Sequence, residues 1–278
     1  MLSAGPASAA DPVLVGAGDI SDCARGHDWA TAKLLAGIAG TVFTAGDNVY
    51  PDGTTAEFQD CYGPTWGRYL ARTRPAAGDN DYETADASGY FGYFGARAGS
   101  PTNGYYSFDI GAWHAVILNS DCSEIGGCGV RSPQVTWLRS DLAAHPRACT
   151  IAIWHHPRFS SGQSTPDDRS LAIWQALYDA GADVIVNGHR HQYERFAQQT
   201  PTGLPSSYGI REFVVGTGGA PLTGFSTIAP NSRVRESSTY GVLKLTLHAT
   251  TYDFAFVPIA GQTFSDSGSF PCHGRPAA

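Results

Sequence analysis

Metal-binding side chains follow four short apolar runs of the chain, and this arrangement limits the folds that are possible. Asp19 follows residues 13–18, Asp47 follows residues 41–46, His155 follows residues 149–154, and the pair His189 and His191 follows residues 183–186. Short apolar runs bounded by turn residues predict buried strands, and the carboxyl ends of neighbouring buried strands converge at one edge of a sheet. Ordinary turn chemistry explains any one of these residues. Four strand ends that carry carboxylate and imidazole groups predict a metal site.

Five short motifs occur along the chain in a definite order. They are Gly18-Asp19, Gly46-Asp47-Asn48-Val49-Tyr50, Gly78-Asp79-Asn80-Asp81, Trp154-His155-His156-Pro157 and Gly188-His189-Arg190-His191. This order resembles that of the calcineurin-like metallophosphoesterases, over about residues 11–215. Tyr50 makes the purple acid phosphatase branch the nearest resemblance, because the Gly-Asp-x-x-Tyr form of the second motif belongs to that branch, where the tyrosinate binds a ferric ion. The resemblance implies an α+β fold: a four-layer α/β/β/α sandwich of two mixed sheets flanked by helices.

The resemblance also implies ligands for two metal ions. Asp47 is expected to bridge both ions. The remaining ligands are Asp19, Tyr50 and His191 for the first ion, and Asp79, His155 and His189 for the second. The favoured pair is Fe(III) with a divalent ion of iron, zinc or manganese, and two divalent ions are the alternative. Two ions about 3.5 to 4 Å apart lower the pKa of a shared water and hold both oxygens of an in-line displacement.

The third motif departs from the family pattern, which is Gly-Asn-His followed by an acid. Asp79 replaces a neutral amide ligand, and Asn80 replaces the usual histidine. Asn80 can donate a hydrogen bond to a phosphate oxygen, but it cannot deliver a proton to a departing alkoxide. His156 is the second candidate for binding phosphate or orienting the leaving group, and a structural histidine bonded to a backbone carbonyl is the alternative. Ser21 stands where the branch usually has glycine, and its hydroxyl is a weak ligand at best.

Length and composition indicate one large core. The chain has 278 residues with 42% hydrophobic content and no linker-like segment, so we expect residues 11–278 to form a single catalytic domain. Residues 1–10 contain a small-residue stretch of the kind that ends at a signal-peptidase site, and we interpret them as a remnant of a signal or propeptide. A chance resemblance in an alanine-rich protein is the alternative. The net charge of -7 argues against a nucleic-acid backbone as partner, and no apolar run is long enough to cross a bilayer.

Six cysteines can pair in fifteen ways. Their positions favour Cys23–Cys61, Cys122–Cys128 and Cys149–Cys272. The first pair lies in the loops after the first two ligand strands, the second brackets residues 123–127, and the third would tie the C-terminal tail to the start of a central strand. Free thiols in a cytosolic enzyme are the alternative. The small-residue N-terminus and the lack of any Cys-x-x-Cys spacing favour disulfides and export.

Helix and strand signals alternate through most of the chain and give way to strands alone in the last third. Helices are expected to be capped by Asp28, to open at Ser132-Pro133, and to run from Arg169 to a stop at Gly181. Strands are expected as a hairpin of residues 105–109 and 113–119, and then at residues 212–215, 242–247 and 252–258. This order predicts two packed sheets covered outside by helices.

Three further features bear on the site. Residues 51–103 have little periodicity but many aromatic side chains, so we expect an ordered functional loop in which Tyr90 or Tyr93 faces the cleft and touches the organic part of a substrate. Glu194 and Arg195 are expected to form a pair that fixes the last ligand turn, with an exposed ion pair as the alternative. The Gly-rich residues 216–219 are expected to let the backbone approach the site closely.

These features predict a secreted, extracellular hydrolase of small-molecule phosphate esters that uses a metal-bridging hydroxide. A phosphomonoesterase that works as a monomer is the favoured hypothesis. A phosphodiesterase is the first alternative, because the same metal pair serves both reactions and the cleft decides between them. A catalytically weak homologue that binds metal or ligand is the second alternative.

Overall fold

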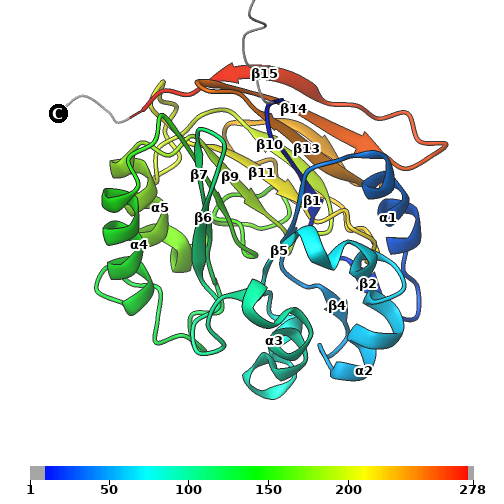
Figure 1. Cartoon of the computed structure of the whole chain (residues 1–278). Helices are drawn as coiled ribbons and strands as arrows, with labels where there is room; N and C mark the ends of the chain where they lie inside the picture. The colour runs from blue at the N-terminus through cyan, green and yellow to red at the C-terminus, as the bar shows by residue number, and fades with distance from the viewer. Residues whose placement is uncertain (1–9, 275–278) are drawn as a thin grey trace, which may run out of the picture.

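Two mixed β-sheets form the centre of the fold in the computed structural model, which describes residues 10–274 (Figure 1). The strands of the first sheet are β1 (Val13–Ala17), β3 (Thr41–Ala45), β5 (Thr73–Ala76), β13 (Gly241–Leu247), β14 (Thr251–Pro258) and β15 (Ser267–Pro271). Those of the second are β6 (Tyr106–Ile110), β7 (Trp113–Ile117), β8 (Cys149–Ile153), β9 (Val184–Asn187), β10 (Tyr193–Phe196), β11 (Arg211–Val215) and β12 (Ser232–Glu236). The short strands β2 (Ser21–Asp22) and β4 (Val49–Tyr50) pair beside them.

The strand order brings the ligand motifs to one edge of the molecule. The first sheet runs β15-β14-β13-β1-β3-β5, and the second runs β12-β10-β11-β9-β8-β7-β6. Strands β1, β3 and β5 are parallel neighbours, and so are β8 and β9. The loops that leave these strands therefore start at the same end of each sheet, which is where open α/β sheets build their sites.

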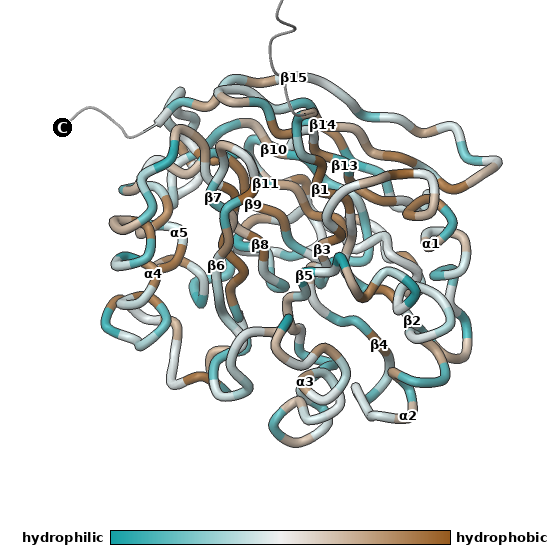
Figure 2. Tube along the Cα trace, in the orientation of Figure 1, coloured by the Kyte–Doolittle hydropathy of each residue, from teal (hydrophilic) through white to brown (hydrophobic). Residues whose placement is uncertain are grey.

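The packing of the strands shows the four-layer sandwich directly. In β8, Ile151 and Ile153 join the core between the sheets, whereas Ala152 packs with the helices α4 (Pro133–Ala144) and α5 (Leu171–Ala180). This alternation is the two-residue period of a strand buried on both faces. Helix α1 (Asp28–Gly37) covers the opposite side of the pair of sheets (Figure 1). The most apolar segments lie on the central strands (Figure 2), and the predicted fold class is confirmed.

The helix ends show which local sequence signals were sufficient to predict where a helix begins or ends. Ser132 caps α4 by accepting from Val135 N at 3.3 Å, and Gly181 ends α5 in the left-handed region with a φ of 78°, both as predicted. The expected cap by Asp28 is wrong, because His27 holds the cap position of α1. The Asp28 carboxylate instead accepts from Ser21 Oγ at 2.8 Å and from Thr65 Oγ1 at 2.7 Å, so it ties the helix to strand β2 and to the loop that contains Thr65.

Residues 51–103 are more regular than the sequence predicted. They contain β5, the helices α2 (Thr55–Glu57) and α3 (Ser88–Phe94), and helical turns at Phe58–Tyr62, Trp66–Arg72, Asn80–Tyr82, Ala85–Ala87 and Gly95–Ala98. A further turn, Asp168–Ser170, precedes α5. Strand β5 was not predicted because its sequence, Thr-Arg-Pro-Ala, is neither an apolar run nor an alternation of apolar and polar residues.

Three disulfide bonds join Cys23 to Cys61, Cys122 to Cys128 and Cys149 to Cys272. These are the three pairs favoured from the sequence. The described residues include no helix with both the length and the apolar character needed to span a membrane. The interpretation of residues 1–10 concerns a segment that lies, except for Ala10, outside the described residues.

Candidate metal centre

Three of the predicted ligands are turn residues whose backbone lies in the left-handed region. The φ angles are 58° at Asp19, 48° at Asp47 and 66° at His189. This region is sparsely populated by residues other than glycine, although aspartate and histidine enter it more readily than most. Each of these residues directly follows a strand or its terminal glycine. Backbone strain at three ligand positions on one edge is typical of a functional site.

The first predicted ligand group converges around the hydroxyl of Tyr50. The Tyr50 Oη atom lies 2.8 Å from Asp19 Oδ1, 2.7 Å from Asp47 Oδ2 and 3.1 Å from His191 Nε2. The His191 Nε2 atom is also 3.1 Å from Asp19 Oδ1. Four side chains from three segments of the chain therefore present donor atoms to one small volume.

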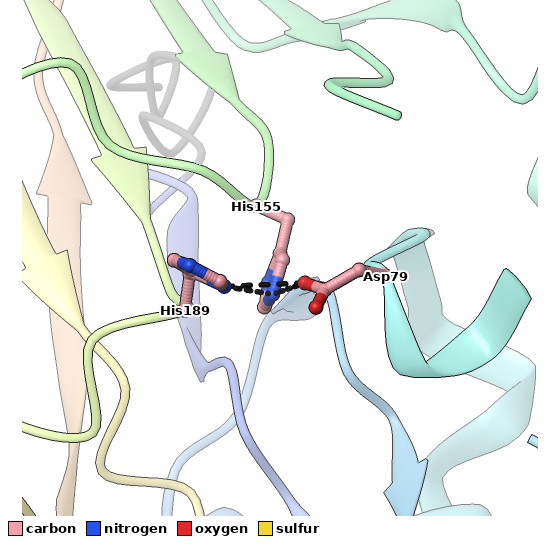
Figure 3. Close-up of side chains that lie close together, drawn as sticks. All are labelled: Asp79, His155 and His189. Atoms are coloured by element: carbon pink, nitrogen blue, oxygen red, sulfur yellow. Dashed lines mark hydrogen bonds and ion pairs between the residues drawn. The ribbon is translucent and has the colours of Figure 1, made fainter. Parts of the chain in front are cut away.

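The second predicted group converges around one oxygen of Asp79 (Figure 3). The Asp79 Oδ1 atom lies 2.9 Å from His155 Nε2 and 3.1 Å from His189 Nδ1, and these two nitrogens are 3.3 Å apart. Asp47 Oδ1 lies 3.3 Å from His155 Nε2. The two oxygens of Asp47 thus face different groups, with Oδ2 toward Tyr50 and Oδ1 toward His155.

Backbone carbonyls fix the orientation of two imidazoles. His155 Nδ1 lies 2.8 Å from the Ala45 carbonyl oxygen, and His191 Nδ1 lies 2.8 Å from the Pro221 carbonyl oxygen. Each Nδ1 therefore carries the proton, which leaves Nε2 free to bind a metal ion. This support of metal-binding imidazoles by a second acceptor is common in metalloproteins.

The electrostatics of the group favour bound cations. Asp19 and Asp47 are almost fully buried, at 0% and 2% exposure. Burial and the charges of Asp19 and Asp47 raise the pKa of Tyr50 well above its ordinary value, so only a strongly Lewis-acidic ion would bind it as a tyrosinate. Carboxylate, phenol and imidazole donors suit iron, zinc and manganese. The residues present therefore fit the ions that the sequence predicts.

Asn80 and His156 lie beside these donor groups. Asn80 Nδ2 donates to Asp47 Oδ2 at 2.7 Å, and Asn80 N donates to Asp47 Oδ1 at 2.9 Å. His156 Nε2 lies 3.3 Å from Asp79 Oδ1, while its Nδ1 is held 2.9 Å from Ser120 Oγ rather than by a backbone carbonyl. Burial lowers the pKa of His156, and the nearby His155 and His189 lower it further, so this ring is neutral.

The expectation that Tyr90 faces the cleft is wrong. Tyr90 is fully buried, and its hydroxyl donates to the Pro75 carbonyl at 3.1 Å. Tyr93 is partly exposed, but its ring stacks on Phe58 with centroids 5.1 Å apart and packs edge-on against Phe94. Both rings serve the packing of α3, which an aperiodic sequence does not reveal.

The predicted pairing of Glu194 with Arg195 is also wrong. Neighbouring residues of a strand point to opposite faces. Glu194 accepts from Ser161 N at 2.8 Å, whereas Arg195 Nε lies 2.7 Å from Asp266 Oδ2. The close approach expected at residues 216–219 is confirmed, because a Cβ at Gly216 would lie 2.7 Å from Asp19 Oδ2.

One supporting residue of the site was not singled out from the sequence. The Asp81 carboxylate is fully buried and accepts from Gly78 N at 2.9 Å and from Asn48 Nδ2 at 2.8 Å, which joins the second motif to the third. Burial and the charge of Asp47 raise the pKa of Asp81 to about 8. The acid at the end of the third motif was the signal that could have identified it.

Two facing mixed sheets, with helices outside and metal-ligand side chains at one edge, define the class of metallo-dependent phosphatase folds. The family model described as calcineurin-like phosphoesterase matches residues 10–193, and the chain belongs to this family.

Its curated relatives include purple acid phosphatases of Arabidopsis thaliana. Purple acid phosphatase 18 is 32% identical over 131 residues, which is 44% of this chain and 28% of that protein. Purple acid phosphatase 22 is 31% identical over 153 residues, which is 50% of this chain and 33% of that protein. The matched part of the chain thus spans a third or less of these two relatives.

Solved structures share the fold at low sequence identity. Purple acid phosphatase PPD1 from yellow lupin seeds superposes with a TM-score of 0.75 at 18% identity, over 96% of this chain and 55% of that chain. GAP50, described as the anchor in the inner membrane complex of Plasmodium, gives 0.70 at 14% identity, over 96% and 90% of the two chains.

Proposed function

We propose that the protein is a secreted phosphomonoesterase that uses two metal ions. The observation that carries the proposal is the position of Asp47, whose two carboxylate oxygens face two different donor groups. Asp19, Tyr50 and His191 would hold one ion with Asp47, and Asp79, His155 and His189 would hold the other. Iron(III) with a divalent ion is favoured because of Tyr50, and two divalent ions are the alternative. Bound ions would supply Lewis acidity and an activated water, so no protein nucleophile is required.

The other residues of the edge would bind and orient the substrate. Asn80 presents an amide that can donate to a phosphate oxygen once metal binding has engaged Asp47. The neutral imidazole of His156, fixed by Ser120, can accept or donate one hydrogen bond but is no ready source of protons. Neither residue is therefore suited to protonating a poor leaving group.

Export is supported by the three disulfides, which persist in oxidising compartments. Residues 11–278 would act as one catalytic domain on a small-molecule phosphate ester, as a monomer and without nucleic-acid or membrane partners.

The fold alone does not decide the activity, because GAP50 shares it and is described as an anchor. The test measures metal content and the turnover of an aryl phosphate and of the matching bis-aryl diester. Faster turnover of the monoester supports the proposal, whereas faster turnover of the diester favours a phosphodiesterase. Full metal occupancy without turnover of either ester would favour a catalytically silent homologue.

A further inference from the structure

Arg190 stands between two proposed metal ligands and forms no ion pair with a carboxylate of residues 10–274. Its side chain has one polar contact within residues 10–274, from Nη2 to Gln163 Oε1 at 3.3 Å. Its Nε atom is buried and has no acceptor in the described part of the chain. The arginines that form ion pairs with carboxylates in the described part of the chain are Arg147, Arg158, Arg169 and Arg195.

An unpaired and partly buried guanidinium needs a physical reason. The partly buried position costs the folded protein part of the solvation of this cation. Buried N–H groups without an acceptor are rare in native structures and are often found where a ligand supplies the missing atom. Guanidinium groups bind phosphate and carboxylate through two parallel hydrogen bonds.

The surroundings hold Arg190 in place. Gln163 Nε2 donates to the Arg158 carbonyl at 2.8 Å, which fixes the amide that contacts Arg190. The same segment is anchored by two buried carboxylates, since Ser161 N donates to Glu194 at 2.8 Å and Arg158 N donates to Glu212 at 3.1 Å. The Arg190 side chain is thus positioned before any ligand arrives, which reduces the entropy lost on binding.

The side chain of Arg190 lies beside Gly162 and Gln163. A Cβ at Gly162 would lie 3.2 Å from Arg190 Cδ, so the stem runs along the segment that carries Gln163. Neither Gly162 nor Gln163 is a proposed metal ligand. A guanidinium held beside this segment, and carried by the residue between two proposed ligands, can reach a group next to the phosphate that the ions would hold.

We propose that Arg190 binds a second anionic group of the substrate, so that the preferred substrates are phosphate esters that carry an additional phosphate or carboxylate. This inference rests on the proposed phosphoesterase function. It assigns Arg190 as a specificity-determining residue, and it explains why a cation occupies the position between His189 and His191.

The test uses non-hydrolysable ligands and needs no turnover. Methylphosphonate carries one anionic group, phosphonoacetate adds a carboxylate, and methylenediphosphonate adds a second phosphonate. Calorimetry with the metal-loaded protein would compare the three ligands for the native chain, Arg190→Gln and Arg190→Lys, with metal content measured after each titration. Arg169→Gln is the matched control, because it removes a nearby guanidinium that Asp167 already neutralises at 2.9 Å.

We expect Arg190→Gln to weaken at least one of the two dianionic ligands by about ten-fold or more, which is typical of one lost charge-assisted hydrogen bond. Methylphosphonate should change by a much smaller factor, and Arg190→Lys should lie between the native chain and Arg190→Gln. The ligand that loses affinity identifies the second group as carboxylate or phosphate.

Equal losses for all three ligands, no loss for any, or the same losses in Arg169→Gln would overturn the inference. Turnover of phenyl phosphate, measured in parallel, separates the two proposals. Turnover with no role for Arg190 refutes the subsite alone, and Arg190-dependent binding without turnover refutes the proposed function alone.

Discussion

Replacement of Asp47 by alanine is the sharpest test of a shared metal ligand. The Asp47 carboxylate lies beside side-chain donor atoms of both groups, at 2.7 Å from Tyr50 Oη and 3.3 Å from His155 Nε2. Asp47→Ala should therefore weaken both metal sites. His155→Ala removes a ligand of the second group and should chiefly weaken one site.

The expected stoichiometries follow from ligand loss. Loss of a supporting contact to a metal ligand typically costs about 10- to 100-fold in metal affinity, so loss of the ligand itself should cost at least about 100-fold. At a free metal concentration of about ten times the native Kd, occupancy of a site falls from about 0.9 to about 0.1. The native protein should then bind about 1.8 ions, His155→Ala about 1.0 and Asp47→Ala about 0.2.

Equilibrium dialysis followed by elemental analysis measures these values directly. Asp60→Ala, which removes an exposed carboxylate, is the control, and circular dichroism checks that each variant is folded. A stoichiometry near that of the native protein in Asp47→Ala, or equal losses in Asp47→Ala and His155→Ala, would refute the bridging role. A change in activity alone would not test it.

Three further predictions concern individual side chains. Tyr50→Phe should abolish the visible tyrosinate-to-iron charge-transfer band of the iron-loaded protein; a colourless native protein that is fully active with zinc or manganese would argue against the ferric site. Asn80→His should raise the hydrolysis rate of alkyl phosphates, by up to about 10²-fold, more than that of aryl phosphates, and equal effects in steady-state assays would show that Asn80 is not at the leaving group. Burial lowers the pKa of His114, but Asp141 and Asp109 at 2.8 and 2.9 Å outweigh burial and raise it overall. The protonated His114 contributes its full stabilisation below the pKa of the unfolded chain, and this contribution is lost as pH rises through the higher folded pKa. In urea unfolding, His114→Gln should therefore lower the free energy of unfolding more at pH 5 than at pH 9. Equal losses at the two pH values would contradict this.

The sequence was informative where local signals determine structure. Asp19, Asp47 and His155 each follow an apolar run. Parallel pairing of β1 and β3 brings Asp19 and Asp47 together, and the packing of the two sheets on each other adds His155 from the end of β8. Asp79 could be placed only through its motif, because β5 has no strand-like pattern. The disulfide partners could be ranked from position: Cys23 and Cys61 follow neighbouring strands, Cys122 and Cys128 bracket a short loop, and Cys149 and Cys272 were the remaining pair.

Contacts made through tertiary packing could not be predicted from the sequence. Tyr90 is buried because α3 packs its rings inward, although the surrounding sequence has no clear period. The partners of Glu194 and Arg195 include Ser161 and Asp266, which are far from them in sequence. No local rule indicates which distant segment will supply such a partner, and so the adjacent opposite charges suggested a false pair.

The third motif shows how two departures from the family pattern can act together. One oxygen of Asp79 lies within 3.3 Å of nitrogens of His155, His156 and His189, so its added negative charge acts on the whole second donor group. A carboxylate in place of an amide should hold the second ion more tightly and reduce its Lewis acidity. Asn80, bonded to Asp47 at 2.7 Å, supplies no proton to offset that loss. Esters with acidic leaving groups need neither the stronger Lewis acid nor the proton, and so we expect aryl phosphates to be hydrolysed well and simple alkyl phosphates poorly.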